Sequence, residues 1–128
     1  MQTPWGSTHE ATWKVIKKHD FLSGMYIWTG FDYIGEPTPY EWPSVSSYFG
    51  IVDLAGFPKD VYYMYQSEWT DKTVLHIFPH WNWKVGQTVD VWAYYNHADE
   101  VELFLNGKSL GTKSKKGDDL HIMWKVPF

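Results

Sequence analysis

An apolar run that ends in a polar loop is the feature that most constrains this chain. Residues 24–34 read Gly-Met-Tyr-Ile-Trp-Thr-Gly-Phe-Asp-Tyr-Ile, and residues 35–40 continue as Gly-Glu-Pro-Thr-Pro-Tyr. A nearly unbroken apolar run suits a strand that is buried on both faces, as in parallel sheets. Ligands of such sheets bind beyond the carboxyl ends of the strands. The pattern therefore predicts a buried strand that presents Trp28, Asp32 and Glu36 to a site.

Helices are predicted on both sides of this run. Ser7-Thr8-His9-Glu10 has the spacing of a capping box, in which the serine and glutamate side chains satisfy each other's backbone N–H groups. This motif predicts a helix over 8–19 with Ser7 as its N-cap. Apolar residues at helical spacing predict a second helix over 59–67. The irregular segment 41–50 lies between them, and long loops in compact domains are usually functional.

Beyond residue 70 the apolar pattern changes from helical to alternating. Strands are predicted over 74–78, 88–96, 100–106 and 120–126. Asn106-Gly107 is a favoured two-residue hairpin turn, because both central positions of a type I′ turn need positive φ. This half of the chain is therefore expected to form part of an antiparallel sandwich.

Charge balance and the absence of cysteine argue against several classes of function. The formal charge is −4, with eleven lysines, no arginine and fifteen acidic residues, which argues against a nucleic-acid or anionic-membrane partner. Without cysteine there is no disulfide framework and no thiolate metal site. His76 and His80 fall in a predicted strand and its exit, where a spacing of four does not bring side chains together. Neither a metal nor a cofactor is expected.

Aromatic residues are unusually frequent. They make up 20% of the chain and include nine tryptophans, which is more than a core of this size needs. Sugars are natural ligands for aromatic faces; the alternative is that the tryptophans are core or interface residues of a larger protein.

No apolar run reaches transmembrane length, and residues 1–4 lack the regions of a signal peptide. The chain as given is expected to be soluble, and the compartment of its parent is left open.

Four long motifs carry a resemblance to a known family. They are Ile27-Trp28-Thr29-Gly30-Phe31-Asp32-Tyr33, Ser47-Tyr48-Phe49-Gly50-Ile51-Val52-Asp53, Phe78-Pro79-His80-Trp81-Asn82-Trp83 and the segment 102–111. With these motifs the chain resembles the β-galactosidases of glycoside hydrolase family 2, and the likeness spans nearly its whole length. The resemblance implies an α+β fragment of two domains. Residues 1–69 would be the last helix, strand, loop and helix of a TIM (β/α)8 catalytic barrel. Residues 70–128 would begin a partial antiparallel immunoglobulin-like β-sandwich.

The family's reaction is the retaining hydrolysis of a terminal β-D-galactoside, which needs two carboxylates about 5 Å apart. In the family both are glutamates on earlier barrel strands, so the resemblance implies that this chain holds no catalytic residue. It implies instead that Trp28 lies on the floor of the sugar pocket. Asp32 is expected to bind a sugar hydroxyl or to orient the loop, and Tyr40 and Trp42 to line the outer wall or to pack the loop. Glu36 is expected at the rim, and Val45 stands where the family commonly has a basic residue.

Two other functions remain open at this stage. One is a non-catalytic carbohydrate-binding module, which the aromatic residues and the β-rich tail favour. The other is a structural or assembly segment, which would self-associate through the unpaired edge of the strand predicted over 24–29. The parent's sugar is also open, because family 2 includes enzymes for galactosides, glucuronides and mannosides.

Overall fold

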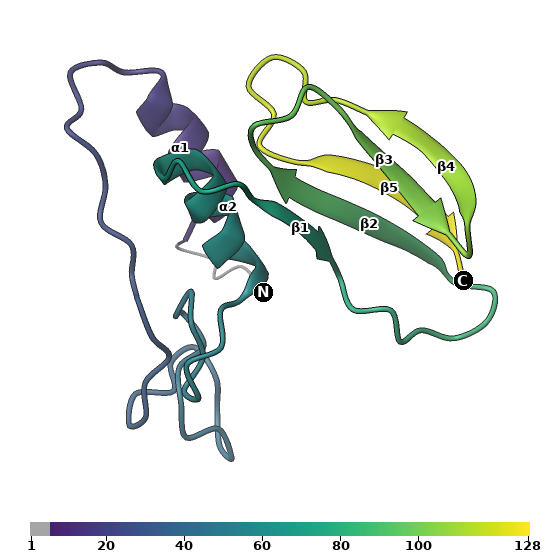
Figure 1. Ribbon diagram of the computed structural model, residues 1–128. Coiled ribbons are helices and arrows are strands. Elements are labelled where there is room, and N and C mark those ends of the chain that lie inside the picture. Colours follow the sequence, from purple (N-terminus) through teal and green to yellow (C-terminus); the bar gives the residue numbers. More distant parts are fainter. Residues whose placement is uncertain (1–5) are drawn as a thin grey trace. The chain divides into compact units, whose positions relative to one another are not determined.

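The computed structural model describes residues 6–128 (Figure 1). In chain order the elements are α1 (His9–Lys17), α2 (Asp60–Trp69), β1 (Leu75–Phe78), β2 (Thr88–Tyr95), β3 (Val101–Leu105), β4 (Lys108–Lys113) and β5 (Ile122–Pro127). The chain is thus α+β with antiparallel sheets, as expected. Residues 1–4, on which the signal-peptide expectation rests, lie outside the described residues. No helix within the described part is both long and apolar enough to cross a membrane.

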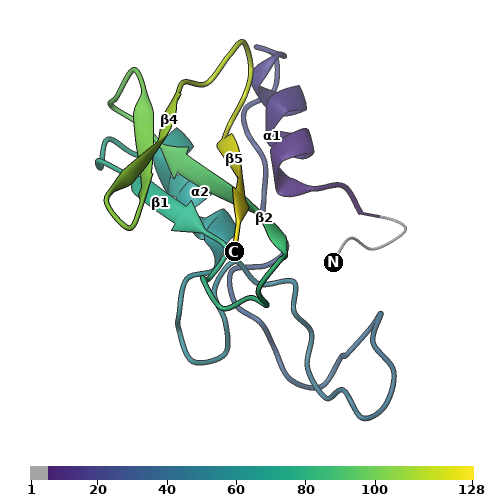
Figure 2. The same cartoon turned by 90° about the vertical axis from the view of Figure 1, so that its right-hand side faces the viewer.

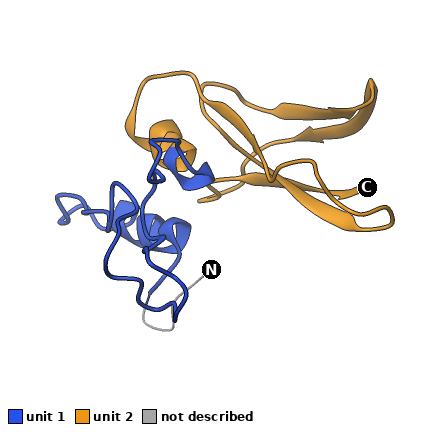
Figure 3. Cartoon of the chain, turned by 90° about the horizontal axis from the view of Figure 1, so that it is seen from below, with its two compact units in different colours: residues 1–62 blue, residues 63–128 orange. Residues whose placement is uncertain are grey.

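The chain divides into two compact units (Figure 3). Unit 1 comprises Met1–Tyr62 and unit 2 comprises Tyr63–Phe128, so the division falls inside α2. Unit 1 consists of α1 and a long region without regular structure, which Figure 2 shows as an irregular trace leading to α2. Unit 2 holds all five strands. The domain boundary expected after residue 69 stays a prediction.

Helix α1 is capped one residue later than the sequence suggested. Thr8, not Ser7, is the N-cap: its hydroxyl accepts a hydrogen bond from Ala11 N at 3.2 Å. Glu10 then occupies the second helical position, so it cannot close a capping box, which needs the third. The Ser7 hydroxyl instead forms a hydrogen bond with the hydroxyl of Thr12.

Residues 24–29 belong to no strand or helix, so the prediction of a buried strand is wrong for this chain. Tyr26 is fully exposed and Trp28 is 73% exposed. A strand buried on both faces needs neighbouring strands and a covering layer on each side. The described residues of unit 1 provide neither, because they form isolated β-bridges and no strand.

Helix α2 forms close to the predicted range. It buries Met64, Tyr65 and Ser67, and the Ser67 hydroxyl donates to Met64 O at 2.7 Å. The ring of Tyr65 packs against Trp69 with centroids 4.4 Å apart. Burial disfavours the phenolate and raises the pKa of Tyr65 to about 12.

Strands β1, β2, β3 and β5 confirm the strands predicted from the alternating pattern, whereas β4 is a further strand that the pattern did not predict. A three-stranded antiparallel sheet has the order β1-β2-β5, and β3 pairs with β4 in a separate hairpin. Asn106 and Gly107 turn this hairpin with φ of 51° and 78°, as the Asn-Gly motif predicts. A bulge follows between Glu102 and Phe104, where Gly111 on the partner strand has φ of 97°.

The core of unit 2 lies between the two sheets. Val89, Val91, Ala93 and Tyr95 of β2 are buried with Ile122, Trp124 and Val126 of β5. Leu103 and Leu105 of the hairpin pack against this cluster, and Trp124 Nε1 donates to Gly111 O at 3.1 Å. Each buried aliphatic or aromatic side chain of this kind contributes about 1.5–3 kcal/mol. Hydrophobic burial therefore stabilises unit 2.

Candidate functional site

Hydrogen bonds between two segments build the candidate site in unit 1. Residues 28–35 lie against residues 45–52, and we call these segments together with Lys59 the loop core. Backbone hydrogen bonds of 2.9–3.2 Å join the segments, among them Asp32 N to Val52 O at 2.9 Å. Because the bonds cross between distant parts of the chain, they fix the loop without a regular sheet.

Asp32 lies at the centre of the loop core. Only 6% of the residue is exposed, and its Oδ1 accepts hydrogen bonds from Gly50 N at 2.8 Å and from Lys59 Nζ at 2.7 Å. Lys59 Nζ also donates to Tyr48 O at 3.2 Å. Burying a carboxylate is costly unless it is paired with an opposite charge and accepts hydrogen bonds. Asp32 thereby ties together three parts of the loop.

Gly50 is a glycine because nothing larger fits beside Asp32. A Cβ atom at this position would lie 2.2 Å from Asp32 N and 2.4 Å from the carbonyl carbon of Phe31. Both contacts are with backbone, which cannot swing away as a flexible side chain could. The close approach lets the Gly50 N–H reach the carboxylate.

Trp28 presents most of its surface to solvent. The residue is 73% exposed, and its ring contacts Tyr33 edge-on, with centroids 6.2 Å apart and an interplanar angle of 79°. The peptide bond between Trp28 and Thr29 is cis. The next residue belongs to the bonded part of the loop core, because Thr29 N donates to Phe49 O at 3.2 Å. The tryptophan is therefore anchored through its backbone while its ring remains accessible.

Tyr40 is half-buried and packs edge-on against Tyr48, with ring centroids 5.0 Å apart. Trp28, Asp32 and Tyr40 thus have different partners: Tyr33 for the first, Gly50 and Lys59 for the second, and Tyr48 for the third. Glu36 and Val45 are exposed. The roles of these residues in binding sugar stay predictions.

Sequence reasoning missed Gly50 and Lys59 as organising residues. Lys59 was assigned only to the start of a helix, although it is the one basic residue between positions 28 and 59. A buried aspartate in that stretch needs a cation, so the composition of the loop already contained this signal.

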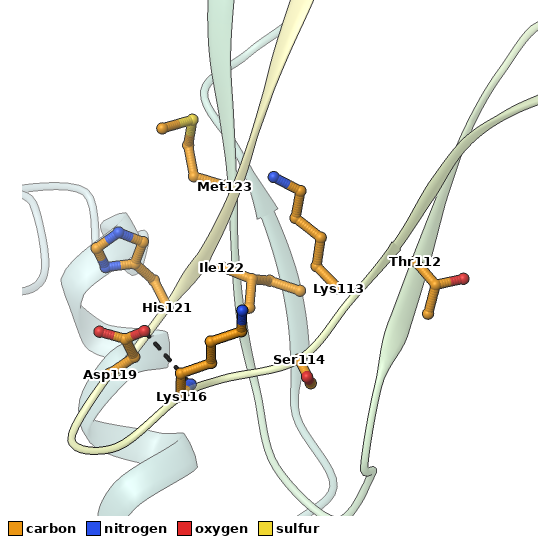
Figure 4. A pocket seen from close by; sticks show the side chains of 8 residues that line it. All are labelled: Thr112, Lys113, Ser114, Lys116, Asp119, His121, Ile122 and Met123. Carbon is orange, nitrogen blue, oxygen red and sulfur yellow. Dashed lines mark hydrogen bonds between the residues drawn. The ribbon is translucent and has the colours of Figure 1, made fainter.

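Unit 2 contains two hollows of different character. One, of about 540 Å³, has a mixed lining that includes the polar Lys113, Lys116 and His121 and the apolar Ile122 and Met123 (Figure 4). Its one hydrogen bond drawn in Figure 4 runs from Lys116 N to Asp119 Oδ2 at 3.3 Å. The other, of about 330 Å³, is apolar. Among residues 6–128 no cluster of three histidine or carboxylate side chains could hold a metal ion.

His76 and His80 contact different aromatic rings. His76 stacks between Tyr63 and Phe78, with centroid distances of 3.9 and 5.6 Å. His80 stacks on Trp83 at 5.5 Å. Both histidines therefore belong to aromatic packing on unit 2.

Sequence relatives of this chain are glycosidases. A domain of unknown function, DUF4982, matches residues 86–128. The β-galactosidase BoGH2A of Bacteroides ovatus is 71% identical over 125 residues, which are 98% of this chain and 15% of that protein. A β-glucuronidase of Formosa agariphila is 32% identical over 103 residues, which are 80% of this chain and 10% of that protein. The chain thus spans a small part of the curated relatives it matches.

Solved structures of glycosidases also resemble this chain. A β-glycosidase from Bacteroides vulgatus has a TM-score of 0.84 at 42% identity, covering 94% of this chain and 15% of that one. A glycosyl hydrolase family 2 member from Bacteroides cellulosilyticus has a TM-score of 0.77 at 30% identity, covering 93% and 20%. The chain therefore belongs to glycoside hydrolase family 2, and it corresponds to one segment of these relatives.

Proposed function

We propose that this chain is the segment of a retaining β-galactosidase-like enzyme that shapes one side of the sugar pocket, with both catalytic glutamates elsewhere in the polypeptide. The observation that carries the proposal is the exposed ring of Trp28 on an anchored backbone. A flat aromatic face stacks on the apolar C–H face of galactose, and its fixed backbone limits the entropy lost on binding.

Asp32 acts in this proposal as a positioning residue. Its Oδ1 already accepts from Gly50 N and Lys59 Nζ, and the residue is buried. The carboxylate therefore holds the loop in the shape that presents Trp28. Of the two roles expected from the sequence, orientation of the loop fits these contacts better than binding of a sugar hydroxyl.

Tyr40 forms the outer wall of the proposed pocket. Its edge-on contact with Tyr48 ties it to a residue whose carbonyl accepts from Lys59. The wall and the aspartate thus depend on the same lysine. A tyrosine held in this way offers both an apolar ring and a hydroxyl to a sugar.

The proposal also assigns the two parts of the chain. Residues 1–69 are inferred to be the C-terminal part of a TIM-barrel catalytic domain, and residues 70–128 the N-terminal part of an immunoglobulin-like sandwich. The exposed loop core next to an apolar run supports the first assignment, since barrel sites lie in the loops that follow strands. The two packed antiparallel sheets of unit 2 support the second.

A neutral sugar suits this segment better than an acidic one. Glucuronides carry a carboxylate, for which a protein usually provides a cationic side chain. Lys59 is the one basic residue between positions 28 and 59, and it is bound to Asp32. The β-galactosidase at 71% identity favours a galactoside. A glucuronide is the second candidate, because other relatives are named β-glucuronidases.

The test is kinetic and uses a full-length enzyme that contains this segment. Trp28→Ala is expected to lower kcat/KM for a chromogenic β-galactoside by about 100-fold or more, because lost stacking misplaces the sugar. Phe21→Ala is the matched aromatic control, since Phe21 is 81% exposed and lies outside the loop core, and should change kcat/KM less than about twofold. Near-normal turnover of Trp28→Ala would remove this residue from the site. If the enzyme hydrolysed the matching β-glucuronide faster than the β-galactoside, a glucuronide would become the first candidate substrate.

A further inference from the structure

The larger hollow of unit 2 lies between the end of β4 and the start of β5 (Figure 4). Its volume is about 540 Å³, which falls within the range of roughly 300–1,000 Å³ that is usual for small-molecule sites. Every residue that lines it comes from the continuous stretch 112–123. The hollow therefore belongs to unit 2 alone, and the loop that joins the two strands sets its shape.

Positive charge dominates the lining. It contains the ammonium groups of Lys113 and Lys116 and one carboxylate, that of Asp119. This carboxylate accepts a hydrogen bond from Lys116 N at 3.3 Å, so it serves the backbone and not the ammonium group. Lys113 Nζ lies 5.9 Å from the centroid of the Trp124 ring, a contact that leaves its N–H donors for an oxygen ligand. Within residues 6–128 neither ammonium group is paired with a carboxylate.

The loop that carries these charges is fixed to the core. Lys115 N donates to Tyr95 Oη at 3.0 Å, and Lys115 Nζ donates to Tyr95 O at 2.9 Å. Tyr95 is only 2% exposed, so this lysine anchors the loop to a core residue. Asp119 N donates to Lys116 O at 3.0 Å and closes the turn that follows. A fixed loop presents its charges with little further loss of conformational entropy on binding.

The rest of the lining suits a ligand larger than a simple ion. Ser114 adds a hydroxyl group, and Ile122 and Met123 add apolar surface. His121 is held in place by stacking on Trp92, with centroids 3.8 Å apart and an interplanar angle of 17°. A sugar ring offers hydroxyl groups to polar side chains and C–H groups to apolar ones. The hollow thus combines cationic, polar and apolar contacts of the kind that an acidic sugar needs.

We propose that this hollow binds an acidic sugar residue, whose carboxylate or sulfate group lies between the ammonium groups of Lys113 and Lys116 and whose ring lies against Ile122 and Met123. Charge-assisted hydrogen bonds to such groups are stronger than those to neutral acceptors. Membership of glycoside hydrolase family 2 favours a saccharide over an acidic peptide. The inference rests on the geometry of unit 2 and does not depend on the role of Trp28.

Isothermal titration calorimetry of the 128-residue chain tests the proposal, with circular dichroism to show that each protein is folded. The probes are trigalacturonate, a sulfated galactotriose, neutral galactotriose and sodium sulfate. At least one acidic trisaccharide is expected to bind at a single site, at least about tenfold more tightly than galactotriose. The tighter of the two acidic trisaccharides identifies the anionic group that the site prefers.

The double variant Lys113→Gln/Lys116→Gln should weaken this binding by at least about tenfold, because it removes both cations from the hollow. Lys108→Gln/Lys125→Gln is the matched control. It changes the net charge equally at two exposed lysines outside the hollow, and it should change the affinity less than about twofold. Lys113→Arg/Lys116→Arg keeps both charges and should retain binding.

Four results would overturn the proposal. Equal affinity for galactotriose and the acidic trisaccharides would remove the role of charge. Equal losses in the two glutamine double variants would show that net charge matters and the hollow does not. Sodium sulfate that binds as tightly as the acidic trisaccharides would reduce the hollow to a general anion site. Triglutamate that binds as tightly would assign it to acidic peptides.

Discussion

The loop core of unit 1 and the sandwich core of unit 2 are held together by opposite means. The buried residues of the loop core are polar or glycine: Asp32, Ser46, Ser47 and Gly50. Several of its large apolar residues are exposed, among them Phe31 at 61% and Ile34 at 72% exposure. In unit 2 the buried cluster is apolar throughout apart from the hydroxyl of Tyr95 and the indole N–H of Trp124.

This difference separates two tasks. Unit 2 buries its own apolar side chains and so has a core that resists unfolding. The loop core is ordered by hydrogen bonds and one ion pair, which fix geometry but contribute less net stability. Its outward apolar surface remains for other polypeptide or for a ligand. Changes in unit 2 should therefore alter global stability, whereas changes in the loop core should act locally.

The largest effect is expected from Trp124→Ala in the sandwich core. It removes a buried indole and its hydrogen bond to Gly111 O, so the free energy of unfolding should fall by about 3–5 kcal/mol. Urea denaturation followed by circular dichroism measures this. Trp42→Ala, at an 86% exposed position, should stay within about 0.5 kcal/mol. A loss below about 1 kcal/mol for Trp124→Ala would contradict the role given to this core.

Gly50→Ala should come next, with a cost of about 1–3 kcal/mol that is confined to the loop core. The new methyl group would overlap the Asp32 backbone N at 2.2 Å. Gly30→Ala is the matched control, because a Cβ there meets nothing within 4 Å. Hydrogen exchange resolved by mass spectrometry should show faster exchange over 28–52 for Gly50→Ala alone. Equal hydrogen exchange in Gly50→Ala and Gly30→Ala would mean that the loop core does not depend on the close approach of Gly50 to Asp32.

Asp32→Ala should open the loop core without unfolding unit 2. Loss of the carboxylate leaves Gly50 N–H and Lys59 without their shared acceptor, at a local cost of about 1–2 kcal/mol. Peptides over 45–52 should exchange faster, and peptides over 88–95 should not change. Asp90→Ala, which breaks the exposed pair with Lys125 at 3.0 Å, serves as control and should have almost no effect. Faster hydrogen exchange over both 45–52 and 88–95 would contradict the proposal that changes in the loop core act locally.

The smallest effect concerns alkaline pH and unit 2. Burial raises the pKa of Tyr65 from 10.0 to about 12, so the folded state holds this proton more tightly than the unfolded state. The stability that this group contributes is intact below pH 10 and declines as pH rises toward 12. Tyr65→Phe should flatten the pH dependence of urea midpoints in that window, and Tyr26→Phe, at a fully exposed ring, should not. If Tyr65→Phe left the pH dependence of the urea midpoint unchanged, another group would have to cause the loss of stability in this pH range.

Local patterns predicted much of unit 2. The alternation of apolar residues predicted β1, β2, β3 and β5 but not β4, and Asn106-Gly107 predicted the hairpin turn, because both signals act between neighbours in the sequence. The polar centre of the loop core was not predictable in this way. Asp32 and Lys59 are 27 residues apart, and no local rule joins them. The same limit explains the error at residues 24–29, since an apolar run indicates burial but not which polypeptide supplies the neighbours.

Hydrolysis of a chromogenic β-galactoside by the purified 128-residue chain tests the central claim most directly. The claim is that the chain carries a sugar-stacking surface but not the catalytic pair. Circular dichroism must first establish that the chain and its Glu36→Gln variant are folded. The account predicts no turnover by either protein. Turnover by the chain that Glu36→Gln abolishes would place a catalytic carboxylate within these residues and contradict the account.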